Sequence, residues 1–285
     1  MALRSFSFSR CTVAAITALG LAGACAGYIV LDIEQRKVIF QPDARIWHRS
    51  NTDGMTEVWI PFRSPSSHQR VRLHGLWLPH ASPHAPVMLY LHGRRWNLTA
   101  ATERMRNMHS LGFSVLAIDY RGFGQTTPSH LPTQTSVHED ALAAWEWLRT
   151  HYPQQQRVIF GHSLGGAIAV QLAAQVPDEQ LLLLEGSFTS IADMARSYPW
   201  GWLLVEPLVT QKFDSRAQIA HVGSPVVIVH GDADRLIPSS HAHALYAAAQ
   251  APKQLAIVPG GTHHSTNTQA LPQLRAALTD GLTAP

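Results

Sequence analysis

The stretch that decides the fold is RVIFGHSLGGAIAV, at residues 157–170. Three apolar residues, 158–160, are too few for a helix of their own and are typical of a strand buried on both faces. Gly161, Ser163 and Gly165 follow in the pattern G-x-S-x-G, and small residues after them begin a helix that can pack closely on a sheet. The stretch therefore predicts a strand, a sharp turn and a helix.

Ser163 lies at the tip of the predicted turn. A turn this sharp brings the residues two positions before and two positions after the serine nearly into contact, which leaves no room for a Cβ atom on either. Gly161 and Gly165 meet this demand. The hydroxyl of Ser163 is then exposed above the carboxyl edge of the sheet, and we expect it to act as a nucleophile.

The composition favours one domain and argues against nucleic acid as a partner. Of the 285 residues, 46% are hydrophobic, which is ample for a large core. The formal net charge is +3, and no cluster of Lys and Arg is longer than a pair. Because a nucleic-acid surface needs a basic patch, we expect no nucleic-acid partner.

The 17 histidines do not predict a metal site, because neither H-E-x-x-H nor C-x-x-C occurs in the sequence. His241 and His243 share a predicted helix, but residues two apart on a helix point in different directions. Both cysteines, Cys11 and Cys25, lie in the N-terminal segment. We expect neither a metal nor a cofactor.

Residues 1–34 are interpreted as a signal anchor or a signal peptide. Residues 12–31 carry no charge, follow Arg4 and Arg10, and are long enough to cross a bilayer as a helix. Small residues at 22–26 would also suit cleavage by signal peptidase. We expect attachment to the membrane through this segment with an extracytoplasmic catalytic domain, or secretion after cleavage.

Strand and helix patterns alternate through residues 35–285. Alternating apolar and polar residues predict two antiparallel edge strands, at 56–62 and 71–79. Continuous apolar runs predict buried strands at 86–91, 113–120, 158–160, 181–184, 225–230 and 253–258. Helices are expected at 99–111, 137–148, from the turn at Ser163 to Val176, and at 269–282. The pattern predicts an α/β fold with a mostly parallel eight-stranded sheet and helices on both faces.

The periodicity becomes irregular between residues 191 and 222, a stretch that contains Trp200 and Trp202. It is longer than an ordinary connection between a strand and a helix. We expect either a small cap over the site or a surface helix with core aromatics.

A carboxylate and a histidine follow the last two predicted strands. Asp232 and Asp234 lie in the loop after residues 225–230, and His263 and His264 lie in the glycine-rich turn after residues 253–258. A nucleophilic serine needs a histidine as base and a carboxylate that holds the ring in the correct tautomer. One residue of each pair is therefore a candidate partner of the serine.

The loop after residues 86–91 begins His92-Gly93-Arg94. In a serine hydrolase this loop donates a backbone N–H to the oxyanion, and a glycine lets the backbone come close. The N–H groups of Arg94 and Leu164 are our candidates for the oxyanion hole.

The chain resembles the α/β-hydrolase superfamily, and within it the Bem46-like and ABHD13/ABHD17-like serine hydrolases. The resemblance is carried by QRKVIFQP from Gln35, LHG from Leu91, DYRGFG from Asp119, GHSLGG from Gly161, FDS from Phe213, HGDADRLIP from His230 and PGGTHH from Pro259. The order Ser, Asp, His along the chain is also that of this superfamily. The resemblance implies that Asp234 is the acid in preference to Asp232, and that His263 is the base in preference to His264.

The chain departs from the family at Arg94, Arg95 and Trp96, where small or amide residues are common after LHG. The shape and charge of the acyl or leaving-group pocket are therefore left open. Arginines here would suit an anionic substrate, and they would equally suit a solvated loop.

Together these patterns predict a serine hydrolase that cleaves esters or thioesters of a small-molecule or lipid-like acyl substrate, with Ser163, Asp234 and His263 as its triad. Two other functions stay open. One is a peptidase of the same fold, and the other is a binding protein that keeps the fold without catalysis. The resemblance implies the reaction class and leaves the substrate undetermined.

Overall fold

One eight-stranded sheet forms the centre of the computed structural model, which describes residues 10–45, 52–197 and 206–282. The strands are β1 (Thr56–Arg63), β2 (Arg70–Leu78), β3 (Val87–Leu91), β4 (Ser114–Ile118), β5 (Arg157–His162), β6 (Leu181–Glu185), β7 (Val226–Gly231) and β8 (Lys253–Val258). Their order across the sheet is β1-β2-β4-β3-β5-β6-β7-β8. Strand β2 is antiparallel to β1 and β4, and the other neighbours are parallel. The predicted mostly parallel sheet of eight strands is confirmed.

The strand register brings the loops of interest to one edge of the sheet. Leu91 at the end of β3 pairs with Gly161, and His162 at the end of β5 pairs with Glu185. Gly231 at the end of β7 pairs with Val258 at the end of β8. Because these strands are parallel, the loops that follow them share the carboxyl edge.

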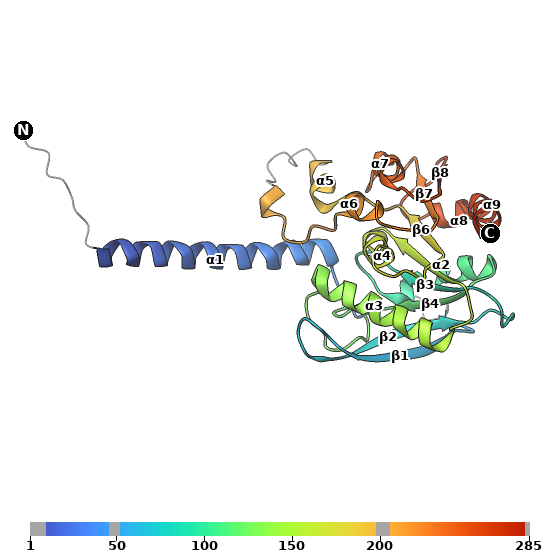
Figure 1. Cartoon of the computed structure of the whole chain (residues 1–285), viewed down its shortest axis with the longest axis horizontal. Helices are drawn as coiled ribbons and strands as arrows, with labels where there is room; N and C mark the ends of the chain where they lie inside the picture. Colours follow the sequence, from blue (N-terminus) through green and yellow to red (C-terminus); the bar gives the residue numbers. More distant parts are fainter. Residues whose placement is uncertain (1–9, 46–51, 198–205, 283–285) are drawn as a thin grey trace, which may run out of the picture.

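Helices cover both faces of the sheet (Figure 1). They are α1 (Arg10–Phe40), α2 (Leu98–Ser110), α3 (Gln134–His151), α4 (Leu164–Ala173), α5 (Ile191–Arg196), α6 (Ser215–Ile219), α7 (Ser240–Ala248), α8 (Thr266–Gln269) and α9 (Leu271–Leu282), with a 3₁₀ turn at Glu206–Leu208. Apolar residues of α3, α4, α6 and α7 pack on one face, and those of α2 and α9 pack on the other. Each face of the sheet thereby acquires its own hydrophobic core.

The predicted helices are present with different bounds: α2 begins and ends one residue earlier than the predicted 99–111, and α3 extends three residues beyond the predicted 137–148 at each end. The helix after Ser163 ends at Ala173 instead of Val176. The expected closing helix at 269–282 is α9, which begins two residues later, at Leu271, and a short helix that was not predicted, α8, precedes it. Pro272 lies in the first turn of α9, where a proline is tolerated because its missing N–H has no partner there in any case.

Helix α1 extends beyond the uncharged run at 12–31 and continues to Phe40. Figure 1 shows most of α1 projecting from the domain, with its C-terminal end against the body near α5 and α6. The side chain of Phe40 is fully buried, and its ring lies 5.9 Å from that of Phe213. The segment 17–40 is long and apolar enough to cross a membrane, a test that a signal sequence also passes.

The irregular stretch 191–222 contains α5, the 3₁₀ turn and α6. Trp200 and Trp202 lie outside the described residues. The described part of the stretch runs beside the end of α1, since Gln35 Nε2 donates to the carbonyl oxygen of Leu208 at 2.6 Å.

Candidate active site

Ser163 occupies a strained backbone conformation between β5 and α4. Its φ of 56° and ψ of −121° lie in a region that residues with a Cβ rarely adopt. A Cβ on Gly161 would come within 2.4 Å of the carbonyl oxygen of Gly165. The close approach expected for the residues on either side of Ser163 is therefore present, and the packing of β5 and α4 holds the serine at the tip.

The loop after β3 lies directly against this turn. A Cβ on Gly93 would be 3.0 Å from Cβ of Ser163, and a Cβ on Gly165 would be 2.0 Å from the carbonyl oxygen of Leu91. The residue after Gly93 is Arg94, whose side chain borders the same cavity as Ser163. Glycine at these points lets the two loops approach closely enough for both to contact one substrate atom.

The two oxyanion-hole candidates differ in how they are positioned. Leu164 is the first residue of α4, so its N–H lies at the positive end of the helix dipole. Arg94 is followed by Arg95 and Trp96, which both have positive φ, 65° and 57°. The loop is tied down on both sides, because Arg95 N–H donates to the carbonyl oxygen of Phe40 at 3.0 Å and the Tyr120 hydroxyl donates to that of His92 at 3.1 Å.

Asp234 and His263 form a short hydrogen bond, with 2.7 Å between Oδ2 and Nδ1. An ionised carboxylate only accepts hydrogen bonds, so Nδ1 carries the proton and Nε2 is the basic nitrogen of the neutral ring. Burial works against the charge of Asp234. The hydrogen bond from His263 and those from Leu236 and Ile237 nevertheless hold the pKa of Asp234 below its ordinary value.

The neighbouring Asp232 has a different contact. Its Oδ1 accepts the backbone N–H of Gly260 at 2.7 Å and thereby joins the loops after β7 and β8. His264 is exposed, and its ring contacts those of His263 and Trp96 at centroid distances of 5.4 and 5.5 Å. Of the two predicted pairs, the structure brings Asp234 and His263 together.

His230 supports the loop that carries Asp234. This residue is fully buried at the end of β7, and its Nε2 lies 2.8 Å from the carbonyl oxygen of Ile237. Because a carbonyl oxygen only accepts, Nε2 is the protonated nitrogen. The bond closes the loop from His230 to Ile237 and limits the positions that the Asp234 carboxylate can take.

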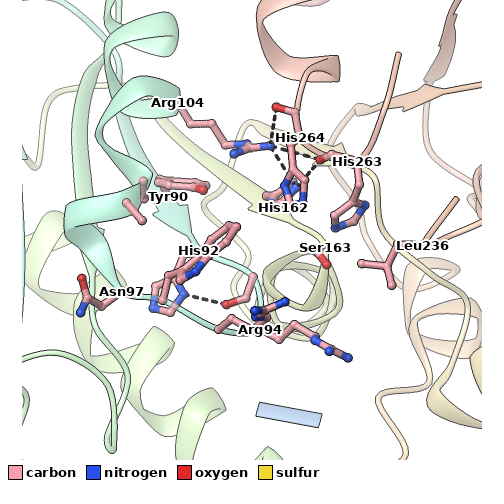
Figure 2. A pocket seen from close by; sticks show the side chains of 15 residues that line it. Tyr90, His92, Arg94, Asn97, Arg104, His162, Ser163, Leu236, His263 and His264 are labelled. Atoms are coloured by element: carbon pink, nitrogen blue, oxygen red, sulfur yellow. Dashed lines mark hydrogen bonds between the residues drawn. The ribbon is translucent and has the colours of Figure 1, made fainter. Parts of the chain in front are cut away.

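Arg104 reaches the site from α2, although no motif in the sequence indicates it. Its guanidinium lies 3.0 Å from the Glu185 carboxylate. Figure 2 shows the same group beside His162, with 3.2 Å to Nε2. It also lies 3.4 and 3.5 Å from the carbonyl oxygens of His263 and His264. The position of Glu185 near the site could be predicted from the sequence, because this polar residue ends a buried strand. The role of Arg104 could not, because an arginine in the middle of a helix is usually an ordinary surface residue.

The charges of this cluster follow from its surroundings. Burial alone would lower the pKa of Arg104, but the adjacent Glu185 carboxylate raises it above its ordinary value. Burial, with Arg104 close by, holds the pKa of His162 well below its ordinary value. The cluster is therefore an ion pair beside a neutral imidazole.

Ser163, His263 and Arg94 border one small polar cavity of about 120 Å³ (Figure 2). Its other polar walls are His92, Arg95, Asn97, Arg104, His162 and His264. Asp234 lies behind His263, on the side of Nδ1. A hydroxyl and an imidazole from distant parts of the sequence thus border one cavity, and a carboxylate contacts the imidazole. These are the groups that nucleophilic catalysis requires.

His241 and His243 lie on different sides of α7, as their spacing predicts, since His241 is buried and His243 is exposed. Within the part of the chain that the structure describes, no group of three or more His, Cys, Asp or Glu is arranged to hold a metal ion.

Comparison with known proteins agrees with the fold. Residues 82–216 match the Hydrolase_4 family model, described as serine aminopeptidase, S33. The chain is 37% identical over 182 residues to an uncharacterized protein of Mycobacterium tuberculosis, across 63% of each chain. It is 25% identical over 245 residues to lysophosphatidylserine lipase ABHD12 of Rattus norvegicus, across 80% of this chain and 56% of that protein. The matches therefore span less than two thirds of these relatives' own length.

Solved structures are similar in fold. Esterase Pf2001 of Pyrococcus furiosus superimposes with a TM-score of 0.66 at 16% identity, across 86% of this chain and 97% of the esterase. Est1E of Butyrivibrio proteoclasticus, solved with ferulic acid, gives a TM-score of 0.65 at 17% identity, across 80% of this chain and all of Est1E. The chain accordingly has the α/β-hydrolase fold, is similar to proteins named esterases and lipases, and matches the Hydrolase_4 family model over residues 82–216.

Proposed function

We propose that the protein is a serine hydrolase that cleaves carboxylic esters or thioesters through Ser163, His263 and Asp234. The observation that carries the proposal is the 2.7 Å bond between His263 and Asp234 beside the strained Ser163, in a cavity that the serine and the histidine share. We also propose that the protein belongs to the Bem46-like and ABHD13/ABHD17-like serine hydrolases, which its sequence motifs resemble.

The reaction proceeds by acyl transfer. Nε2 of His263 takes the hydroxyl proton as Oγ of Ser163 attacks the carbonyl carbon, and Asp234 stabilises the imidazolium that forms. The oxyanion accepts hydrogen bonds from the N–H groups of Leu164 and Arg94. The protonated His263 then gives its proton to the leaving alcohol or thiol, and an acyl-enzyme remains. Water, activated by the same imidazole, hydrolyses this ester and restores Ser163.

The names of the relatives support a substrate class. A relative named lysophosphatidylserine lipase and structural neighbours named esterases support a lipid-like acyl ester. The family model is described as serine aminopeptidase, so a peptide amide is the second candidate substrate. A panel of p-nitrophenyl esters, acyl-thioesters and peptide amides distinguishes the two.

Ser163→Ala tests the chemistry. We expect loss of turnover and of labelling by a fluorophosphonate probe, with the unfolding temperature unchanged because one hydroxyl is removed from a preformed turn. Ser110→Ala, at an exposed serine that ends α2, is the matched control and is expected to keep both activities. Normal hydrolysis by the Ser163→Ala protein contradicts the assignment, and wild-type protein that never labels points to a binding protein instead.

The same proposal includes attachment to the membrane through α1, with the catalytic domain outside the cytoplasm, or secretion after signal cleavage. The exposed apolar residues of α1, among them Leu19, Leu21, Ile29 and Val30, support it. Membrane fractionation and N-terminal sequencing test it: an intact N-terminus in the membrane fraction indicates an anchor, and a shortened soluble form indicates cleavage. Full-length protein that is wholly soluble contradicts membrane attachment.

A further inference from the structure

A second cavity also opens on Ser163. It has a volume of about 370 Å³, and it shares Ser163, Arg94 and Leu236 with the polar cavity. Apart from Arg94 and Ser163, its walls outside α1 are apolar, namely Leu164, Phe188, Ile191, Met194, Ala195, Val209, Leu236 and Ile237. The site is therefore divided into a small polar part and a larger apolar part that meet at the proposed nucleophile.

Helix α1 forms the remaining wall of this apolar cavity. Its contributing residues are Leu31, Glu34, Gln35, Val38 and Ile39. Their spacing of three, four, seven and eight residues from Leu31 places all of them on one face of the helix. The uncharged run of the sequence ends at Leu31, so the cavity begins where this uncharged run stops.

The polar members of this wall are engaged elsewhere. The side-chain amide of Gln35 bonds to the backbone of Leu208 and Thr210, at 2.6 and 3.0 Å. Glu34 pairs with Lys37 at 2.7 Å. Leu31, Val38 and Ile39 therefore give the wall its apolar character toward the cavity.

The wall is also fixed in place. Arg36 Nε donates to the carbonyl oxygen of Pro132 at 2.7 Å, and Gln211 donates to the Asp32 carboxylate at 2.8 Å. At the end of the helix, the carbonyl oxygen of Phe40 accepts the N–H of Arg95, one residue after the oxyanion candidate Arg94. The last turns of α1 are thus joined to the catalytic loop as well as to the segment after α5.

We propose that these turns of α1 form one wall of the binding site for a long, unbranched acyl chain, which makes the N-terminal helix a determinant of acyl-chain length. This inference rests on the proposed function of Ser163. A carbonyl carbon at Ser163 must carry its acyl chain on one side and its leaving group on the other. The apolar cavity suits the chain, whereas the polar cavity with Arg94, Arg95 and Arg104 suits a polar leaving group.

The test is the acyl-chain preference of the full-length protein in detergent. Val38→Trp narrows the α1 wall, and because Val38 is 62% exposed, a larger side chain there does not disturb the core. We expect the ratio of kcat/KM for p-nitrophenyl dodecanoate to that for p-nitrophenyl acetate to fall about tenfold, as when about two methylene groups are no longer buried. Val38→Ala, which widens the wall, is expected to shift the preference toward the hexadecanoate ester.

Val30→Trp is the matched control, since Val30 is 59% exposed on the same helix and does not line the cavity. We expect it to leave the chain-length ratio at its wild-type value. A wild-type ratio in Val38→Trp, or an equal change in Val38→Trp and Val30→Trp, overturns the inference. Failure of the proposed function looks different, because Ser163→Ala would then still hydrolyse every ester. If Ser163→Ala is inactive and the Val38 variants label normally with fluorophosphonate, the nucleophile is intact and an unchanged chain-length ratio overturns only the inference about α1.

Discussion

The partly buried Arg104 and the buried Glu185 form an ion pair at 3.0 Å, and the same guanidinium contacts the backbone of the turn that carries His263. Glu185 is further held by Asn267, whose Nδ2 donates to Oε2 at 2.9 Å. Helix α2, strand β6 and helix α8 are thereby joined behind the proposed base. Because backbone contacts restrain the turn, we interpret Arg104 as a residue that positions His263.

Removal of the cation from this pair is expected to weaken both stability and catalysis. Arg104→Met leaves the buried Glu185 carboxylate unpaired, which costs about 3–5 kcal/mol of unfolding free energy. The double variant Arg104→Met with Glu185→Leu removes both charges and is expected to lose less stability than Arg104→Met alone. It should still have a reduced kcat with little change in KM, because the His263 turn lacks its support. Urea unfolding and ester kinetics measure the two effects, and wild-type kcat in the double variant would contradict the positioning role.

The two aspartates of the loop after β7 are expected to differ sharply. In Asp234→Asn, the side-chain amide can donate to Nδ1 of His263, which favours the tautomer with the proton on Nε2 instead of Nδ1. We expect a loss of about 10⁴ in kcat. Asp232→Asn keeps an oxygen that can accept the N–H of Gly260, so we expect kcat within a few-fold of wild type. Steady-state kinetics on one ester compare the variants. Equal losses of kcat in the two variants would contradict a specific role for the Asp234 carboxylate and would indicate an effect of the loop conformation.

The close approach of the turn and the β3 loop predicts intolerance to a single methyl group. Gly165→Ala would place Cβ 2.0 Å from the backbone oxygen of Leu91, which cannot move without disturbing β3. We expect a loss of about 3 kcal/mol in unfolding free energy. At Gly223 an added Cβ meets nothing within 4 Å, so Gly223→Ala is expected to be neutral or to stabilise by roughly 0.5 kcal/mol. Denaturant unfolding tests both, and similar stability for the two variants would contradict the steric argument.

The side chain of Glu179 is expected to make the stability of the folded protein depend on pH. Burial raises the pKa of this carboxyl from 4.5 to about 7 in the folded state. Between pH 4.5 and about 7, the folded protein keeps a proton on Glu179 that the unfolded chain releases. The contribution of Glu179 to the free energy of unfolding is therefore most favourable at acid pH and is lost as the pH rises through about 7. We expect Glu179→Gln to be more stable than wild type by roughly 2 kcal/mol near pH 8, and about equal to it near pH 4. Unfolding curves at both pH values test this, and a pH-independent difference would contradict it.

Much of the fold was predictable because its information is local. Apolar runs locate the strands within two residues of their observed ends, and the G-x-S-x-G turn locates Ser163. Parallel strands direct their following loops to one edge, so Asp232, Asp234, His263 and His264 could be placed near the serine in advance. The choice within each pair came from resemblance alone, since two residues in one short loop cannot be separated by periodicity.

The sequence by itself determined the strands, their alternation with helices and the candidates at the carboxyl edge, because each depends on residues that are neighbours along the chain. Only the tertiary structure decided that Asp234 reaches His263, that Arg104 supports the turn of His263, and that α1 ends in the core at Phe40 and lines an apolar cavity beside Ser163. These relationships join segments that are tens to more than a hundred residues apart. Their energies depend on packing and desolvation between distant segments, which no local pattern records.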